Sequence, residues 1–267
     1  MAVDFEKKEH YHMEDLLEIV KVLRSENGCP WDREQTHESV RQNFIEEVYE
    51  VCEAIDQSDD ELMKEELGDV LFQVVFHAQM CREEGKFTFD DVADGICKKM
   101  IVRHPHIFSD VVANTSEDVL KNWDAIKQKQ KGQSAADTLV SVPATLPALM
   151  RSQKIGQRAA RAKFDYTDSL QALSDLESEI AELKAALQKG DSRNIEEELG
   201  DVLFSAVNVS RHCGVDAEYA LTCSCEKFIR RFAEMQKIAQ EKGEDLTQLP
   251  METLNAYWAQ VKAKETL

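Results

Sequence analysis

The chain has 267 residues, and its 51 Asp and Glu residues outnumber its 32 Lys and Arg residues, giving a formal charge of −19. So acidic a surface repels nucleic-acid phosphate and anionic lipid, which argues against binding to DNA, RNA or membranes. No run of about 18 apolar residues is present, so the sequence predicts no membrane span. The length suits about two domains, and the small numbers of glycine (10) and proline (5) favour long helices.

The seven cysteines are odd in number and show no CxxC spacing. That usage is typical of reduced thiols rather than of a disulfide framework. The first twenty residues are charged and hold no apolar signal core. We therefore expect a cytoplasmic protein.

In chain order, apolar residues recur at spacings of three and four over 42–55 and 62–80, which predicts two amphipathic helices. Ser58, Asp59 and Asp60 are candidate caps for the second helix. The same spacing recurs in the second half, over 173–187. Strand-like alternation is nearly absent, so each half is predicted to be an all-α bundle of about four or five helices.

Segment 132–150 differs from its surroundings, because it holds two of the five prolines and carries no charge from 138 to 150. We interpret it as a linker between a domain at 1–131 and a domain at 151–267. The first domain has 16 Lys and Arg against 30 Asp and Glu, a net charge of −14, whereas residues 132–267 have 16 against 21, a net charge of −5.

The two halves repeat one another. The octet EELGDVLF occurs at 65–72 and again at 197–204. Three weaker matches accompany it, namely FIEEVYEVCEAI (44–55) with LESEIAELKAAL (176–187), CKKMIVR (97–103) with CEKFIRR (225–231), and NWDAIKQK (122–129) with NAYWAQVKAK (255–264). The pattern indicates a duplicated domain.

Each copy carries two pairs of acids, and the members of each pair are three positions apart and so share a helix face. The spacing between the pairs is identical in the two copies, and it allows one helix to end and the next to return antiparallel. Four carboxylates can then meet, and they require a neutralising hard cation such as Mg²⁺, with Mn²⁺ as a substitute. The alternative is a pair of solvated helix faces. The acids are Glu47, Glu50, Glu66 and Asp69 in the first copy and Glu179, Glu182, Glu198 and Asp201 in the second.

Gly68 and Gly200 lie within the predicted helices at a cost of about 1 kcal/mol each relative to Ala. Such a glycine would let another helix or a ligand approach closely. Lys227 and Arg231 are four positions apart on one helix face and could bind phosphate oxygens, although such a pair is often only a solvated face.

Three aromatic residues, Trp31, Phe164 and Trp258, are candidates for stacking on a base, with ordinary packing as the alternative. His104 and His106 flank a proline, which breaks helical geometry. A capping or packing role is therefore favoured over metal binding.

With these residues in view, the sequence resembles the MazG family of nucleoside triphosphate pyrophosphohydrolases over most of its length. The family signature, ExxE followed by ExxD, is met by both sets of acids, and CPWD, RHPHIFSD and EKFIRRF also look like MazG stretches. One departure is that Ser178 stands before Glu179, where the first copy has the Glu46–Glu47 pair.

The resemblance implies a tandem repeat of two MazG-type helical bundles that forms a homodimer. It implies Mg²⁺-dependent hydrolysis of NTPs and dNTPs to a nucleoside monophosphate and pyrophosphate, with broad base preference. The main activity would lie in the second domain, with Glu179, Glu182, Glu198 and Asp201 as catalytic metal ligands and Glu179 as a candidate proton acceptor. The residues expected to bind substrate are Asp175, Glu197, Lys227, Arg231 and Trp258.

Two rival interpretations remain open at this point. A di-iron carboxylate bundle would use Glu-x-x-His pairs, whereas this chain has Asp69 and Asp201 at the matching positions. Alternatively, the first half could be a non-catalytic nucleotide sensor or a protein-interaction and dimerisation module.

Overall fold

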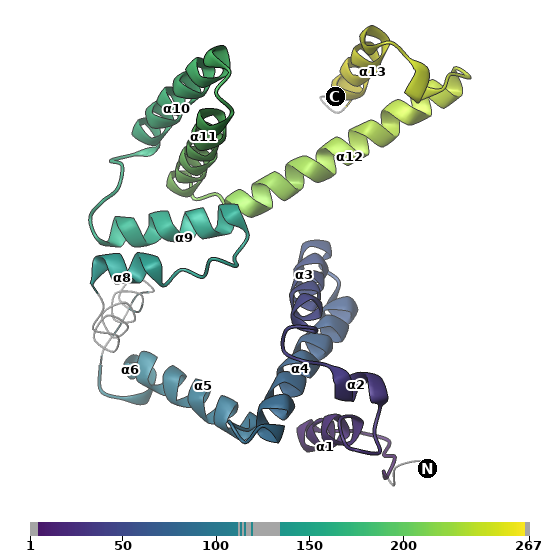
Figure 1. Cartoon of the computed structure of the whole chain (residues 1–267), viewed down its shortest axis with the longest axis vertical. Helices are drawn as coiled ribbons and strands as arrows, with labels where there is room; N and C mark the ends of the chain where they lie inside the picture. The colour runs from purple at the N-terminus through teal and green to yellow at the C-terminus, as the bar shows by residue number, and fades with distance from the viewer. Residues whose placement is uncertain (1–4, 112, 114, 116–118, 120–133, 265–267) are drawn as a thin grey trace. The chain divides into compact units, whose positions relative to one another are not determined.

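The structure is a computed structural model that describes residues 5–111, 113, 115, 119 and 134–264 (Figure 1). Every regular element in this part of the chain is a helix, which confirms the predicted all-α class. The chain divides into two compact units, Met1–Gln130 and Lys131–Leu267. None of the described helices is both long and apolar enough to cross a bilayer. The repeat match at 122–129 lies outside the described residues.

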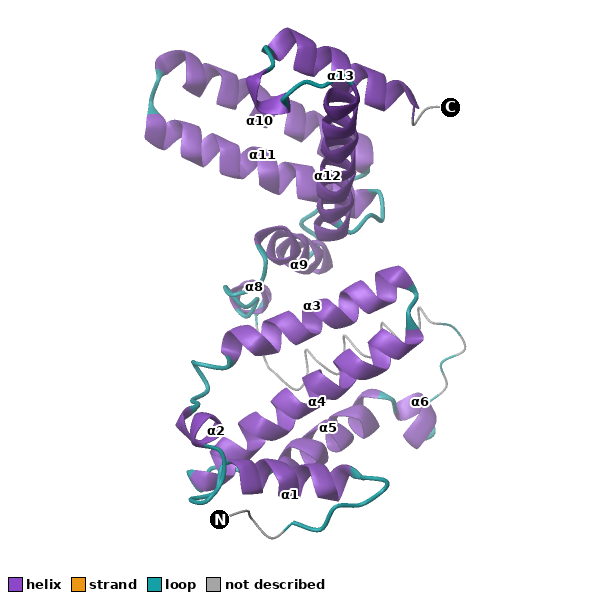
Figure 2. Cartoon of the chain, turned by 90° about the vertical axis from the view of Figure 1, so that its right-hand side faces the viewer, coloured by secondary structure: helices purple, strands orange, loops and turns teal. Residues whose placement is uncertain are grey.

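The first unit is built around a hairpin of two long helices, α3 and α4, which run side by side in Figures 1 and 2. Helix α1 packs against α4, α5 follows α4 and contacts it, and α6 contacts α5. The core lies between α1 and the second half of α4, with Val20, Val75 and Phe76 almost fully buried. The helices are α1 (Met13–Leu23), α2 (Pro30–Glu34), α3 (Arg41–Gln57), α4 (Asp60–Glu83), α5 (Phe89–Arg103) and α6 (Pro105–Phe108).

The turn that joins α1 to α2 depends on a glycine. A Cβ atom built on Gly28 would lie 2.2 Å from the carbonyl oxygen of Val22 and 2.3 Å from that of Leu23. Backbone atoms cannot yield at such distances, so only glycine fits here.

The second unit contains a matching hairpin, α10 and α11, together with a long helix that continues into a smaller helical pair. Helix α9 packs against α11, α8 and the start of α12. The helices are α8 (Ala135–Val140), α9 (Ala148–Arg161), α10 (Ser169–Lys189), α11 (Ser192–His212), α12 (Ala217–Glu241), the 3₁₀ helix η1 (Leu246–Gln248) and α13 (Met251–Lys264). The segment interpreted as a linker, 132–150, therefore holds α8 and the start of α9.

The two hairpins turn in the same way, which is a direct consequence of the repeat. Ser58 ends α3 and Gly190 ends α10, and both take the left-handed conformation, with φ of 54° and 70°. The next residue caps the following helix: Asp59 accepts from the amides of Glu61 and Leu62, as the sequence predicted. Asp191 does the same for α11. Because each turn is so short, the acids on the paired helices face one another.

The far end of α12 packs against η1 and α13. Met235, Ile238 and Ala239 of α12 are buried there with Tyr257 and Val261 of α13. Between this cluster and α9, however, α12 has no covering helix among the described residues, and every position from 221 to 230 is exposed. Apolar side chains share that exposure, including Leu221 at 52% and Ile229 at 58%.

Candidate metal and nucleotide site

In the second unit, the hairpin brings acids from α10 and α11 together. One carboxylate oxygen from each of Glu179, Glu198 and Asp201 lies within 4.8 Å of the other two. Glu182, one turn further along α10, contributes its charge to both glutamates. We call these four residues the second-unit cluster.

The electrostatics of the second-unit cluster show that its charge is not neutralised by the chain. Burial raises the pKa of Glu179, and the charges of Glu182 and Asp201 raise it further. Burial likewise raises the pKa of Glu198, followed by the charges of Glu182, Asp201 and the exposed Glu197. Like charges held this close favour the protonated form unless a cation enters.

A divalent cation fits this donor set. Two oxygens on opposite sides of a Mg²⁺ ion lie about 4 Å apart, because each Mg–O bond is about 2 Å long. The three clustered oxygens lie within 4.8 Å of one another. All the donors are carboxylates, which suits a hard cation such as Mg²⁺ or Mn²⁺.

The first unit holds an equivalent group, the first-unit cluster of Glu47, Glu50, Glu66 and Asp69. Oxygens of Glu47, Glu66 and Asp69 lie within 4.8 Å of one another. Burial raises the pKa of Glu47, and a hydrogen bond with Glu50 and the charge of Asp69 add to the rise. Burial and the charge of Glu50 also raise the pKa of Glu66. Three of the four acids in each set found by spacing therefore converge in space.

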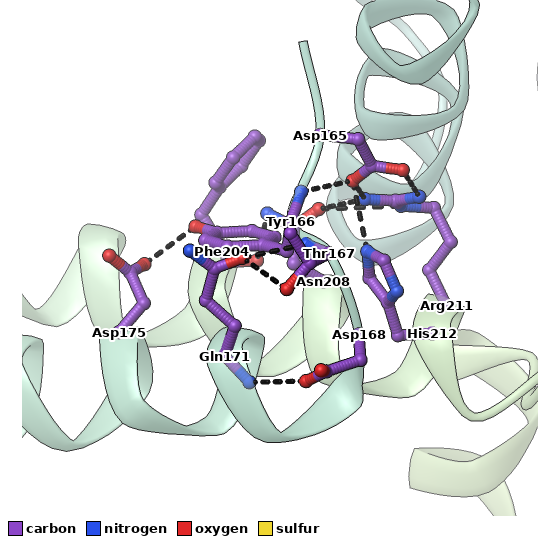
Figure 3. Close-up of polar contacts among 10 residues, drawn as sticks. All are labelled: Asp165, Tyr166, Thr167, Asp168, Gln171, Asp175, Phe204, Asn208, Arg211 and His212. Carbon is purple, nitrogen blue, oxygen red and sulfur yellow. Dashed lines mark hydrogen bonds and ion pairs between the residues drawn. The ribbon is translucent and has the colours of Figure 1, made fainter. Parts of the chain in front are cut away.

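Asp175 lies on α10 one turn before Glu179. One of its oxygens accepts hydrogen bonds from two hydroxyl groups, those of Tyr166 (Figure 3) and Ser205. Tyr166 donates a hydrogen bond to Oδ2 of Asp175 at 2.7 Å, and Ser205 of α11 donates to the same atom at 3.0 Å. Tyr166 belongs to the loop between α9 and α10. Burial and the hydrogen bond to Asp175 raise the pKa of Tyr166 to about 12, so it remains a donor at neutral pH.

An ion-pair clamp fixes the loop that carries Tyr166. Arg211 near the end of α11 binds both carboxylate oxygens of Asp165, and His212 contacts Oδ1 of Asp165 at 2.9 Å. The Arg211 side chain is only 11% exposed. Its guanidinium group holds the pKa of Asp165 well below the usual range. Figure 3 shows the clamp beside the Tyr166–Asp175 contact.

Close packing of α9 against α11 supports the same clamp. A Cβ atom on Gly156 of α9 would lie 2.8 Å from Oδ1 of Asn208 and 2.9 Å from Nε of Arg211. Asn208 in turn accepts a hydrogen bond from Arg211. Glycine at this position therefore leaves room for the side chains that hold the loop.

The candidate substrate residues of α12 and α13 lie in a different part of the second unit. Arg231 places its guanidinium carbon 5.9 Å from the ring centroid of Trp258, and Phe228 lies 5.1 Å from the same ring. Lys227 is one turn before Arg231, in the exposed stretch of α12. Figure 1 shows α12 leading away from the α10–α11 hairpin toward α13.

A pocket of about 420 Å³ lies beside Trp258, between α12, η1 and α13. Its lining is mostly apolar. The lining residues are Phe228, Phe232, Met235, Leu246, Thr247, Met251, Leu254, Asn255 and Trp258. A flat aromatic group would find stacking partners here and two polar side chains, those of Thr247 and Asn255.

Several other predicted residues take up simpler roles. Trp31 is 61% exposed and Phe164 is 82% exposed, so neither belongs to a core. His104 caps the end of α5, and its Nδ1 lies 2.7 Å from the carbonyl oxygen of Met100.

Gly68 and Gly200 of the repeated octets do not serve a close approach to any other described part of the chain. A Cβ atom on Gly68 or Gly200 would meet nothing within 4 Å among the described residues. The predicted close contact with another helix of the same chain is therefore absent in the described part.

Sequence reasoning missed Tyr166 and Ser205. No motif or repeat singled out Tyr166. Ser205 directly follows the repeated octet but lies outside it. The available signal was the difference between the copies, since aligning the two octets places Gln73 opposite Ser205.

The fold and site define a class of all-α proteins, a duplicated helical bundle in which each hairpin brings three carboxylates together. Asp69 and Asp201 stand in these clusters where a di-iron bundle would place histidine. The family model for the MazG nucleotide pyrophosphohydrolase domain matches residues 35–108 and 167–235, one match in each unit. The chain belongs to the MazG family of nucleotide pyrophosphohydrolases.

Curated relatives agree over most of the chain. The chain is 44% identical to the nucleoside triphosphate pyrophosphohydrolase/pyrophosphatase MazG of Thermotoga maritima, over 93% of this chain and 95% of the relative. It is also 44% identical to the nucleoside triphosphate pyrophosphohydrolase of Escherichia coli K12, over 94% and 97% respectively. The protein YabN of Bacillus subtilis is 42% identical over 97% of this chain but only 53% of its own length.

Proposed function

We propose that this protein hydrolyses nucleoside triphosphates, both ribo- and deoxyribonucleotides, to a nucleoside monophosphate and pyrophosphate, at the second-unit cluster. The observation that carries the proposal is the convergence of Glu179, Glu198 and Asp201 in a member of a nucleotide pyrophosphohydrolase family. The net charge of −5 over residues 132–267 favours this half for a polyanionic substrate over the first half.

Different residues of the second unit would bind the metal, accept the proton and bind the substrate. Glu179, Glu182, Glu198 and Asp201 would hold Mg²⁺, which supplies charge stabilisation for phosphate oxygens and makes a water more acidic. Glu179, whose pKa is raised, is suited to accept the proton of the attacking water. Lys227 and Arg231 would bind the departing pyrophosphate, and Trp258 would stack on the base.

Broad base preference is consistent with the pocket beside Trp258. Its walls are mostly apolar side chains, which accept a flat ring without reading its hydrogen-bonding edge. Thr247 and Asn255 are the polar residues in that lining, so few contacts are present that could reject one base strongly.

The test is pyrophosphate release from a panel of ribo- and deoxyribonucleoside triphosphates with Mg²⁺, with Mn²⁺ in a parallel series. Release from several bases, abolished by a chelator and restored by Mg²⁺, is the expected result. No release from any member of the panel would overturn the proposal and leave a nucleotide-binding module as the better account.

The first unit is a candidate for a different function. Its acids converge as closely as those of the second unit. Lys99 and Arg103 of α5 have the spacing of Lys227 and Arg231, but the net charge of −14 over residues 1–131 opposes a polyanionic substrate. A nucleotide sensor or a dimerisation module therefore remains the alternative for this unit.

We also propose that the active form is a homodimer, because each unit has large apolar surfaces that no described element of the same unit covers. On α12, Leu221, Cys225, Phe228 and Phe232 fall on one face when residues are spaced by about 100°. On α11, Leu199 and Leu203 are 47% and 51% exposed. A second copy would cover such faces, and α12 could then bring Lys227 and Arg231 to the cluster of that copy.

Replacing Leu221 by Glu is expected to shift the protein from dimer to monomer, since it places a charge on the apolar face that Leu221 shares with Cys225, Phe228 and Phe232 of α12. Light scattering after size-exclusion chromatography at several protein concentrations measures the change. Cys223→Glu, on the opposite face of the same exposed stretch, is the matched control and should leave the mass unchanged. A monomeric wild type, or equal effects of both substitutions, would contradict the assignment of this face.

A further inference from the structure

The two carboxylate oxygens of Asp175 differ in their hydrogen bonds. Oδ2 accepts from the hydroxyl groups of Tyr166 and Ser205, whereas Oδ1 has no hydrogen bond from any described residue. Tyr166 comes from the loop before α10 and Ser205 from α11, so Asp175 is held from two sides. The Ser205 side chain is buried at 4% exposure, which limits its freedom to turn away.

Two hydroxyl donors on one oxygen fix the orientation of the Asp175 carboxylate. The charge of Asp175 reaches the second-unit cluster, because it is among the charges that raise the pKa of Glu179. Asp175 is thus a fifth acid beside the four, fixed in place but separate from the three whose oxygens converge.

The loop of Tyr166 has its own support, so the tyrosine is not free to leave. The backbone amide of Tyr166 donates to Oδ1 of Asp165 at 2.9 Å. Asp165 is clamped by Arg211 and His212. A continuous chain of polar contacts therefore runs from the end of α11 through the loop to Asp175 on α10 (Figure 3).

The first unit lacks this arrangement. When the two octets are aligned, Asn43 stands for Asp175, Gln73 for Ser205 and Glu34 for Tyr166. Gln73 is buried at 7% exposure, and its hydrogen bond to Glu47 opposes the rise in pKa that burial causes there. At the position of Asp175 the first unit has the neutral amide of Asn43 instead of a carboxylate.

We propose that Tyr166 and Ser205 are positioning residues that fix the Asp175 carboxylate beside the second-unit cluster, which makes this cluster bind divalent cations more tightly than its counterpart. This role is compatible with the substrate contact that the family resemblance implies for Asp175. The inference rests on the proposed function only where it gives the bound cation a role in the hydrolysis of nucleoside triphosphates.

The test measures Mn²⁺ binding alone, by electron paramagnetic resonance without nucleotide. The full chain carries Glu66→Gln and Asp69→Asn, so that bound Mn²⁺ reports the second-unit cluster. In this background, Tyr166→Phe, Ser205→Ala and Asp175→Asn are each expected to raise the dissociation constant about tenfold, the loss typical when a partner that orients metal ligands is removed.

Tyr257→Phe is the matched control, because it removes a tyrosine–carboxylate hydrogen bond, to Glu244, elsewhere in the same unit. It should leave the Mn²⁺ affinity unchanged. Tyr166→Phe combined with Asp175→Asn should bind no more weakly than Asp175→Asn alone, since Tyr166 acts through Asp175. Thermal unfolding of every variant identifies any that fail to fold.

Unchanged Mn²⁺ affinity in folded Tyr166→Phe and Ser205→Ala would overturn the proposal, as would losses that add in the double variant. A wild type that binds Mn²⁺ but releases no pyrophosphate would instead refute the proposed function and leave the positioning role standing.

Discussion

Replacing Glu198 by Gln is expected to lower pyrophosphate release by roughly 10²–10⁴-fold, because a cation bound in a reaction centre contributes several kcal/mol to transition-state stabilisation. Each loss of about 1.4 kcal/mol in that stabilisation slows the reaction roughly tenfold. Glutamine retains the shape of Glu198 but cannot offer a charged oxygen. The fold should survive, because Glu198 repels Glu182 and Asp201 in the absence of a cation. Initial rates at saturating nucleotide and Mg²⁺ measure the loss, and circular dichroism checks the helices.

Glu66→Gln is the matched control, since Glu66 occupies the same position of the repeated octet in the first unit. A loss confined to Glu198→Gln would assign the activity to the second unit. Partial losses in both variants would mean two working sites. Full activity in Glu198→Gln would refute the assignment of catalysis to the second-unit cluster.

Replacing Asp165 by Ala is expected to destabilise the second unit by about 2–3 kcal/mol, less than the loss of one partner costs in a fully buried ion pair. The substitution leaves the guanidinium group of Arg211 without its carboxylate partner, and that side chain is only 11% exposed. Removing one partner of a buried pair costs about 3–5 kcal/mol, and the 25% exposure of Asp165 reduces the figure here. Hydrogen exchange along α10 and α11, followed by mass spectrometry, localises the loss to this unit.

The effect of Asp165 should depend on pH in a defined direction. Its folded pKa lies below the unfolded value of about 3.9, so the ionised carboxylate stabilises the native state above that pH. The stabilisation is lost as the pH falls from about 4 toward the folded pKa. The difference in unfolding free energy between wild type and Asp165→Ala should therefore shrink in acid. A difference that grows below about pH 4 would contradict the clamp.

A surface ion pair provides the control for this prediction. Asp94 and Lys98 pair on α5 with side-chain exposures of 57% and 73%. Asp94→Ala should cost less than about 1 kcal/mol, because water and salt screen such pairs.

The parts of the structure that could be predicted from the sequence are those that depend on neighbouring residues. Helical periodicity located α3, α4 and α10, and Asp59 was one of three residues named as candidate caps of α4. The spacing between the acid pairs then sufficed to bring Glu179, Glu198 and Asp201 together, because a short turn leaves little freedom in how the helices pair.

Contacts between distant segments were beyond the sequence pattern. The Tyr166–Asp175 bond depends on a loop conformation that is set by Arg211, near the end of α11. Periodicity also cannot tell which apolar face finds a partner. Leu67 and Leu199 of the repeated octet fit a core pattern, yet both are about half exposed in the single chain.

The placement of each acidic cluster on one hairpin also has a consequence for the order of folding. The acids of the first-unit cluster lie between positions 47 and 69, and those of the second-unit cluster between 179 and 201. Closing so short a loop costs little chain entropy, whereas the contacts of α4 with α1 join more distant segments. A cation-binding hairpin can thus assemble in the folding transition state. Mg²⁺ would then accelerate refolding more than it slows unfolding.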